Sequence, residues 1–512
     1  MPRLFALIVV VVVLGLPFWW FDREDPPRPE VGELTGEVRD ENGPVAGAVV
    51  RIKGKSNSVE SDRHGRFHLP TPRGTEHVTA SKDGYLIAGV SAKAKPLALH
   101  LERLPVGDCE RYLWVDPTPD ATKPMNCGNC HAAIHDEWQR SGHAHSATNR
   151  RFLNLYDGTD WHGKRGVGWN LLKDHEQGAD VCASCHAPTQ KPGAFGALDM
   201  RRAADGSHGL SGVHCDFCHK IQGPGPGEFG LAHGRFQLQL LRPDPKEGHQ
   251  LFFGPLDDVD RGEDSFSRFQ RDSKLCAACH EGVVFGVPVY TTYSEWQSSP
   301  AASSGTSCQS CHMTPTGKMA NIAPGYGGIR RDPATLGNHR FFDGSQLDML
   351  RRCLKLDAAT RRTAEGIAVD VSIFAQNVGH RVPTGFIDRQ VILFVEAFAE
   401  DKQVALLKGE KLPDVLGPEA GKPGRLYAKV LTDGKSLDPA PFWKGDPATL
   451  IDTRLRPGET DRQTFLFPAG TDRVRIRLVH RRFWKQIAEE KRWPADEQLI
   501  VEREMRGPGI AE

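Results

Sequence analysis

The sequence has no excess of charge of either sign. Its 512 residues include 65 Lys plus Arg and 65 Asp plus Glu, so the formal net charge is zero. No nucleic-acid partner is expected, because proteins that bind nucleic acids usually present a basic face. No Ser-His-Asp grouping, phosphate-binding loop or pair of carboxylates stands out in the sequence. It therefore gives no indication of triad-based hydrolysis, nucleotide binding or acid–base catalysis by paired carboxylates. A chain of this length is too long for one compact domain, and about three domains are expected.

The N-terminus carries an apolar run from Leu4 to Trp20, which is at the short limit for a membrane-spanning helix. Its end has bulky aromatic residues where a cleaved signal peptide would have an Ala-x-Ala site. The run therefore predicts an uncleaved signal anchor over residues 1–25, with a cleaved signal peptide as the alternative. Arg3 before the run places the bulk of the chain on the extracytoplasmic, periplasmic side of the cell membrane. No Cys follows the run, which argues against a lipoprotein anchor.

Residues 32–105 read as short strands separated by turns at 41–43, 62–65 and 82–84. The matching segments are Gly36–Val38, Gly43–Ala48, Asp62–Phe67 and Ala80–Tyr85, and they resemble the carboxypeptidase regulatory-like β-sandwich. The resemblance implies a spacer or docking module without chemistry of its own. The four histidines here are expected on the surface: His64, His68, His77 and His100.

A second region of alternating apolar residues begins near residue 364. Val369, Val371 and Ile373 alternate with other residues, and further strands are expected at 391–398, 426–431, 464–467 and 474–479. These strands predict a second β-sandwich, to about residue 482, followed by a polar helical tail to residue 512.

Five Cys-x-x-Cys-His motifs lie between these two regions, in a segment predicted to be one domain over residues 109–360. Two cysteines three positions apart share one face of a helical turn and can both bond one haem, while the adjacent His ligates its iron. The thioether cysteines are therefore Cys127, Cys130, Cys182, Cys185, Cys215, Cys218, Cys276, Cys279, Cys308 and Cys311. The proximal iron ligands are His131, His186, His219, His280 and His312.

Zinc knuckles or redox-active thiol pairs are the competing interpretation of Cys-x-x-Cys. Neither requires a histidine after every second cysteine, whereas covalent haem does. The sequence therefore predicts five c-type haems, attached outside the cytoplasm. It predicts a multidomain fold: a membrane anchor, two β-sandwiches, and between them a mainly α-helical or irregular cytochrome domain organised by haem.

Some of the motif region hints at an internal duplication, although coincidence of short stretches is an open alternative. The spacing of the second and third motifs is nearly that of the fourth and fifth, and Glu137–Ala144 is similar to Glu295–Ala302. Ala301 stands where the first copy has His143. The local fold does not require that histidine, which favours a ligand role for it.

The segments Cys127–Ala144, Gly212–His219 and Cys308–Met313 resemble the cytochrome c-554 and hydroxylamine oxidoreductase group of multihaem cytochromes. Asn377–Phe386 is similar to the start of a β-domain attached to some members. The resemblance implies haem binding and a redox role, but the group includes both carriers and enzymes. Five motifs match neither the four of the carrier nor the eight of the oxidase.

Electron-transfer haems usually take a second axial ligand, often His. His143 is favoured by the resemblance and the repeat, His208 by its place before the third motif, and His233, His339 and His380 by their sequence positions. Other candidates in the region are His135, His145, His162, His175, His214 and His249, with His145 as the substitute for His143. Met313 is expected to pack. Cys109 and Cys353 are expected either as a disulfide or as free thiols.

The favoured function is electron transfer in a respiratory chain, at the outer face of the membrane and with redox partner proteins of that chain. The alternative is an oxidoreductase that acts on a small nitrogen or sulfur compound, such as nitrite or hydroxylamine, at a five-coordinate haem. Enough histidines are present to fill all five distal positions, which favours the carrier over the enzyme.

Overall fold

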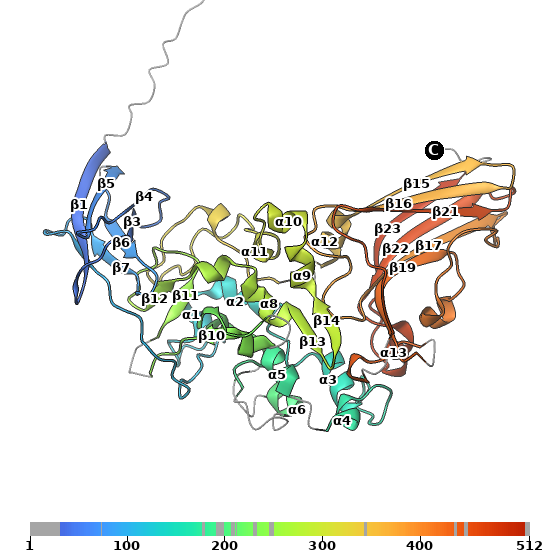
Figure 1. Ribbon diagram of the computed structural model, residues 1–512, viewed down its shortest axis with the longest axis horizontal. Coiled ribbons are helices and arrows are strands. Elements are labelled where there is room, and N and C mark those ends of the chain that lie inside the picture. The colour runs from blue at the N-terminus through green and yellow to red at the C-terminus, as the bar shows by residue number, and fades with distance from the viewer. Residues whose placement is uncertain are drawn as a thin grey trace, which may run out of the picture.

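The computed structural model describes residues 31–506, except 73, 177–179, 191–198, 206–209, 211, 229–232, 245–249, 342–345, 435–437 and 445–448. An N-terminal β-domain, a central region of short helices and a C-terminal β-domain follow one another along the long axis (Figure 1). The anchor predicted over residues 1–25 lies outside the described residues. Across the part of the chain that is described, no helix is long and apolar enough to cross a membrane.

The N-terminal β-domain has two facing sheets, as the alternation and turns predicted. One has the order β2-β1-β5 with β8 on β1, and the other is β4-β3-β6-β7. Inward side chains such as Val38, Val50, Leu69 and Leu99 form one buried core between them. The strands are β1 (Val31–Asp40), β2 (Gly43–Pro44), β3 (Val49–Ile52), β4 (Ser58–Glu60), β5 (Arg66–Pro72), β6 (His77–Ser81), β7 (Ala88–Ser91) and β8 (Ala98–His100).

The four histidines of this domain do not all behave as predicted. Three are exposed, but His77 is half-buried because its Nε2 pairs with Asp260 of the central region at 2.5 Å. Lys53 pairs with the same carboxylate, and Arg51 pairs with Asp257 at 2.6 Å. The β-domain is therefore fastened to the central region by charged contacts.

The central region, here called the motif region (residues 109–353), contains short helices and small two-stranded ladders. Its helices are α1 (Cys127–Cys130), α2 (Ala132–Gln139), α3 (Arg150–Asp157), α4 (Leu171–Asp174), α5 (Asp180–His186), α6 (Met200–Ala204), α7 (Cys215–Cys218), η1 (Gly234–Gln237), η2 (Arg268–Arg271), α8 (Lys274–His280), α9 (Thr292–Gln297), α10 (Pro300–Ser303), α11 (Cys308–His312), η3 (Pro333–Thr335) and α12 (Gln346–Cys353). Its strand pairs are β9 (Ile221–Pro224) with β10 (Leu238–Leu240), β11 (Phe252–Gly254) with β12 (Asp264–Phe266), and β13 (Glu281–Val284) with β14 (Val287–Thr291).

The C-terminal β-domain also has two sheets, of order β15-β16-β21 and β20-β19-β17-β22-β23 with β18 on β17. Alternating residues such as Val369 and Phe465 from one sheet and Val395 and Ile476 from the other share one core. The elements are β15 (Leu354–Arg362), β16 (Ile367–Ala375), β17 (Gln390–Ala399), β18 (Lys402–Gln403), η4 (Asp414–Glu419), β19 (Gly424–Thr432), η5 (Phe442–Lys444), β20 (Thr449–Asp452), β21 (Thr460–Phe467), β22 (Arg473–Arg481), α13 (Lys485–Glu490) and β23 (Gln498–Arg506).

Two predictions about this domain need correction. The helical tail is wrong: after the single short helix α13, the chain forms β23, which pairs antiparallel with β22 and buries Ile500. Its charged residues obscured the strand pattern, since an edge strand has one solvent-facing side. The domain also starts earlier than residue 364, because β15 pairs with β16 from Leu354 onward.

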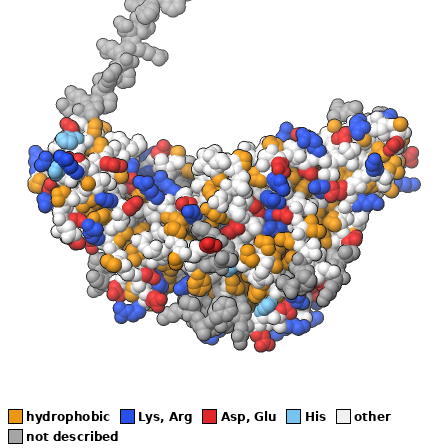
Figure 2. Space-filling view, in the orientation of Figure 1, with side chains coloured by type: hydrophobic (Ala, Val, Ile, Leu, Met, Phe, Trp, Pro, Cys, Tyr) orange, Lys and Arg blue, Asp and Glu red, His pale blue; other side chains and the backbone are white. Residues whose placement is uncertain are grey.

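The C-terminal β-domain shares a large hydrophobic core with the motif region. Tyr156 and Leu171 of the motif region pack in one cluster with Phe394, Trp443 and Trp484 of the β-domain. Lys491 adds polar contacts, because its buried ammonium donates to three motif-region carbonyls. The two parts are therefore packed as one body. On the face that Figure 2 shows, charged side chains of both signs are interspersed.

Candidate haem-binding site

Each of the five motifs forms a short helix or the end of one: α1, α5, α7, α8 and α11. One helical turn places the two cysteines of a motif on the same side, and the histidine follows directly. All ten motif cysteines are free thiols. The predicted attachment groups are thus arranged locally as covalent haem requires.

Three of the motif histidines are oriented by the same kind of hydrogen bond. Nδ1 of His131 donates to the carbonyl of Ile322 at 2.8 Å, and Nδ1 of His186 donates to Ser146 at 2.7 Å. Nδ1 of His219 donates to Phe253 at 2.7 Å. Such a bond fixes the tautomer and leaves Nε2 with a lone pair for a metal, as is typical of metal-ligating histidines.

Two other motif histidines each face a predicted distal histidine. The ring centres of His143 and His280 are 6.2 Å apart, and those of His312 and His380 are 6.1 Å apart. One metal ion between two imidazole nitrogens, with bonds of about 2 Å, separates the ring centres by roughly 6 Å. Nδ1 of His380 donates to the carbonyl of Arg381 at 3.0 Å, so its Nε2 is free for iron. Both pairs fit a haem with two axial histidines.

The surroundings of the paired histidines keep their rings neutral. Desolvation by burial lowers the pKa of His280 to about 4, although part of its surface is exposed. Burial also lowers the pKa of His143 to about 4 and that of His312 to about 3, which keeps these rings neutral, as iron ligation requires. The residues present therefore fit covalently bound haem.

The remaining predicted distal ligands differ in their surroundings. His339 is deeply buried beside His219 and His131, and desolvation lowers its pKa to about 3. His233 uses its Nε2 to donate to the carbonyl of Val283 at 3.0 Å. His208 lies outside the described residues, so its role stays a prediction.

The other candidate histidines that the structure describes show no such facing ring, and His249 lies outside the described residues. His145 is exposed, and Nε2 of His175 donates to the carbonyl of Trp443 at 2.6 Å. Nε2 of His214 is bonded to the Thr189 hydroxyl at 3.0 Å. A ring nitrogen that donates to a carbonyl has no lone pair to offer a metal, which separates His175 from the paired histidines.

Thiols of different motifs lie close together. Cys127 of the first motif is within hydrogen-bonding range of Cys215 of the third. Cys279 of the fourth motif is in the same range of Cys185 of the second. Cys276 of the fourth is likewise beside Cys308 of the fifth. The third motif adjoins the fourth, because Cys218 is close enough to raise the pKa of both Cys276 and Cys279. The five motifs therefore form one contiguous cluster.

Two residues that the sequence analysis did not single out position the third motif. Asp216, inside the motif, is fully buried and accepts hydrogen bonds from the Tyr112 hydroxyl at 3.0 Å and the Val115 amide at 2.8 Å. Lys220, next to the motif histidine, is its ion-pair partner. The sequence did offer a signal for this pair, because an acidic residue lies inside the motif and a basic residue directly follows its histidine.

The repeated segments noted in the sequence have matching roles. Trp138 donates to the carbonyl of Val213 and Trp296 to that of Thr306, both at 2.9 Å. Glu137 accepts the backbone amide of His339 at 2.9 Å. Glu295 accepts the amide of Arg381, next to His380, at 3.2 Å. Each copy thus holds the backbone of a loop that carries a candidate distal ligand.

Glu295 also belongs to a buried ionic cluster between the motif region and the C-terminal β-domain. Its carboxylate pairs with Arg454 at 2.5 Å, and Arg454 pairs with Asp452 at 2.8 Å. Lys429 donates to the Thr291 hydroxyl at 2.7 Å, and burial lowers its pKa to about 8. This cluster holds the loop of His380 from both sides.

Cys109 and Cys353 do not form the disulfide that was one of the two expectations. Both are free thiols, and their partners are different: the Cys109 thiol donates to Asp244, and the Cys353 thiol contacts the carbonyl of Asn377. The alternative of free thiols is therefore correct.

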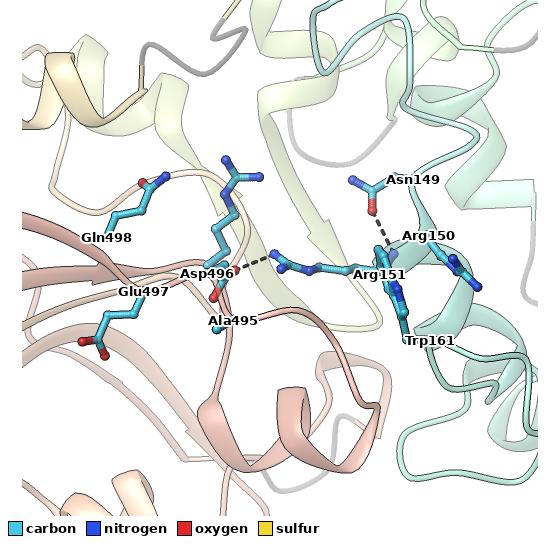
Figure 3. Close-up of a pocket in the computed structure, with 9 residues that line it drawn as sticks. Asn149, Arg150, Arg151, Trp161, Ala495, Asp496, Glu497 and Gln498 are labelled. Atoms are coloured by element: carbon cyan, nitrogen blue, oxygen red, sulfur yellow. Dashed lines mark hydrogen bonds and ion pairs between the residues drawn. The ribbon is translucent and has the colours of Figure 1, made fainter.

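A surface crevice lies where α3 meets the segment before β23 (Figure 3). Figure 3 shows Arg151 reaching across to Asp496, an ion pair of 2.5 Å, while Arg150 points away from it. The crevice contains no motif cysteine or candidate ligand, so it is not the haem site.

Comparisons with known proteins agree with this geometry. Residues 33–96 match the carboxypeptidase regulatory-like domain, and residues 126–220 match the family of cytochrome c554 and c-prime. No curated protein matches the chain significantly. Among solved structures, the penta-heme cytochrome c552 from Thermochromatium tepidum is similar, with 24% sequence identity and a TM-score of 0.53. The match covers 74% of this chain and 97% of that one.

Both resemblances found in the sequence are therefore confirmed. The similarity to the solved structure concerns the fold, whereas the two family matches concern residues 33–96 and 126–220. The chain therefore contains an N-terminal carboxypeptidase regulatory-like domain and a segment that matches the family of cytochrome c554 and c-prime.

Proposed function

We propose that this chain is a five-haem electron-transfer protein, anchored at the membrane on its extracytoplasmic side, which serves redox partners in a respiratory chain. The observation that carries the proposal is the contiguity of the five motifs. Adjacent attachment cysteines would hold the bound haems close to one another, and such a chain of cofactors is suited to moving electrons through a protein.

A haem iron supplies one-electron chemistry when it is bound. The protein residues attach it, orient it and fill its axial positions. Two axial histidines leave no position for a substrate, so the pairs of His143 with His280 and of His312 with His380 support a carrier role at the fourth and fifth motifs. Glu295 and the carbonyl of Arg381 keep the His380 ring in place.

The neighbouring thiols also suggest a route. The first motif adjoins the third, the third adjoins the fourth, and the fourth adjoins both the second and the fifth. A haem held by Cys276, Cys279 and His280 would therefore connect the third motif with the second and the fifth. The order along the route differs from the order along the sequence.

Haem counting tests the number of haems. The intact mass of the purified protein should correspond to five attached haems, and replacing both cysteines of one motif with Ala should remove one haem. A wild-type mass with fewer haems contradicts the proposal.

Stopped-flow reduction tests the route. The double replacement Cys276→Ala with Cys279→Ala removes the central haem. Electrons should then no longer redistribute rapidly among the remaining haems. The matched pair Cys308→Ala with Cys311→Ala removes a terminal haem and should preserve rapid equilibration of the other four. Electron paramagnetic resonance of the unaltered ferric protein should show magnetic coupling between neighbouring haems, and isolated signals would argue against the route.

A specific observation supports the alternative, an oxidoreductase that acts on a small nitrogen or sulfur compound. Among the described residues, no histidine ring is paired with His186 as His143 is with His280; instead Phe152 stacks on His186 at 4.1 Å. A haem with an open site at the second motif should bind carbon monoxide after reduction. A carbon monoxide difference spectrum decides between the two functions, because a carrier with five filled haems gives none.

A further inference from the structure

Arg389 lies directly before β17 and points into the interior. Its Nη1 donates to the carbonyl of Thr384 at 3.0 Å, in the turn that follows His380. The guanidinium also lies against Gly385, where an added Cβ would come within 2.6 Å of Nη1. The turn thus holds the guanidinium in one place and leaves its other donors available.

Arg389 has no acidic partner among the residues that the structure describes. The three arginines that are fully buried each have one: Arg242 pairs with Asp108, Arg454 with Glu295, and Arg481 with Glu419. Arg235, which is partly buried like Arg389, also donates to backbone carbonyls. Desolvation lowers the pKa of Arg389, and a second cation nearby, Arg482, lowers it further. A partly buried, desolvated guanidinium is stabilised by an anion, so its surroundings favour the binding of a negative group.

Arg389 lies near residues of the haem-attachment motifs. Arg389 is close enough to His280 and His380 to lower the pKa of both rings. Tyr290 of β14 is deeply buried beside Arg389 and beside the thiols of Cys182, Cys185 and Cys279. Its hydroxyl makes no hydrogen bond to any described residue. Two hydrogen-bond donors therefore lie beside residues of the second and fourth motifs.

We propose that Arg389 and Tyr290 form a carboxylate-binding site that takes a propionate of a haem attached at the second or fourth motif. The inference rests on the proposed haem-binding function. A planar guanidinium binds a carboxylate through two parallel hydrogen bonds, and a tyrosine hydroxyl adds a third donor. A free oxyanion has the same chemistry, but a propionate is delivered to this space with every attached haem.

The test measures the potentials of the individual haems in Arg389→Gln, with Arg389→Lys and Tyr290→Phe alongside. Losing the guanidinium leaves the propionate charge uncompensated and stabilises ferric iron, so the midpoint potential of one haem should fall. In Arg389→Lys the midpoint potential should fall less, because Lys keeps the positive charge but cannot form the two parallel hydrogen bonds. The resonance Raman band of the propionate bending mode should shift in Arg389→Gln and, to a smaller extent, in Tyr290→Phe.

Arg425→Gln is the matched control, because Arg425 pairs with Glu410 and Asp461 within the C-terminal β-domain. It should leave all potentials unchanged. Haem content is measured first: fewer than five haems in the unaltered protein contradicts the proposed function, whereas five haems with unchanged potentials and Raman band in Arg389→Gln contradicts this inference. If nitrite shifts the absorption spectrum of the unaltered protein but not that of Arg389→Gln, the site binds a free oxyanion. That result would also overturn the propionate assignment.

Discussion

At the scale of single residues, hydrogen bonding of the ring nitrogens distinguishes the histidines. His131, His186, His219 and His380 each donate from Nδ1 to a backbone carbonyl, which leaves Nε2 for iron. His175 and His233 donate from Nε2 instead. The position of the nearest backbone carbonyl decides whether Nδ1 or Nε2 donates. This difference separates histidines that the sequence alone does not distinguish.

Replacing His380 with Ala should leave all five haems attached, because the thioethers do not depend on it. The iron facing His312 should lose its second ligand, turn from low-spin to high-spin and bind carbon monoxide. Absorption and electron paramagnetic resonance spectra measure the change. His145→Ala is the control, since this exposed residue should change nothing. A mutant of His380 with wild-type spectra would exclude the ligand role.

Replacing Glu295 with Gln should weaken both stability and the position of His380. The ion pair with Arg454 is buried, with about 5–8% side-chain exposure. Breaking it should cost about 3 kcal/mol, near the lower end for buried pairs, because Arg454 keeps Asp452 as a partner. Denaturant unfolding measures the loss, and the potential of one haem should move with it. Glu459→Gln, in an exposed pair with Arg456, should change neither.

At the scale of elements, a loop of the motif region fastens the N-terminal β-domain. The segment between β11 and β12 offers Asp257, Asp258 and Asp260 to strand β3 and its neighbours. Asp258 accepts the amide of Gly54 at 2.6 Å and pairs with Arg331 at 2.8 Å. The β-domain is therefore docked in a defined orientation, whereas the sequence resemblance implied only a spacer or docking role.

This docking should depend on acid pH. Burial alone would raise the pKa of Asp260, but Lys53 and His77 outweigh it and the pKa is lowered. Because the folded pKa lies below the usual value of 3.8, the carboxylate stabilises docking above that pH, and the contribution is lost as the pH falls through the folded pKa. Limited proteolysis between residues 101 and 108 should therefore accelerate below about pH 4.

At neutral pH, Asp260→Asn should mimic this loss and weaken docking by about 1–2 kcal/mol, since the cluster is only partly buried. Proteolysis of the same junction measures it. Asp83→Asn, in an exposed turn of the same β-domain, is the control. Equal cleavage of the two variants would show that the charged contacts do not hold the domain.

At the scale of the whole molecule, the two β-domains and the motif region obtain their cores differently. Each β-domain has a core of alternating aliphatic and aromatic side chains between two sheets. The motif region has small clusters of its own and a larger one that it shares with the C-terminal β-domain. These clusters are small for a region of this length, so we expect bound haem to complete its core.

Production without the haem-attachment machinery should therefore give a chain whose motif region is unfolded, since folding and ligand binding are coupled in such sites. Trypsin should digest residues 109–353 rapidly, while the N-terminal β-domain, which has its own core, should persist as a fragment. Mass spectrometry of the digest identifies the surviving parts. A protease-resistant haem-free motif region would contradict the prediction.

The predicted anchor can be tested on protein extracted from membranes. If residues 1–25 remain as a signal anchor, the mature mass includes them and the protein requires detergent. A mature start near Phe21–Asp25, together with soluble protein, would mean a cleaved signal peptide and a free periplasmic protein. The contrast is clear because the two forms differ by the whole apolar run.

The sequence by itself determined the attachment chemistry and the order of the domains. A Cys-x-x-Cys-His motif acts within a single helical turn, so five neighbouring residues are sufficient to identify it. Strands such as β16 and β22 were also predicted correctly, because alternation is a local property of the chain. β23 was missed because charged residues fill much of its length and its pairing with β22 decides its conformation.

Only the tertiary structure decided which residues meet. The partners of His280 and His312 lie far away in the sequence, and no local pattern says that these are His143 and His380. The adjacency of motifs and the lack of an anion beside Arg389 depend in the same way on long-range packing. The attachment motifs are encoded locally, whereas the facing histidine pairs, the surroundings of Arg389 and the adjacency of the motifs arise from contacts between distant segments.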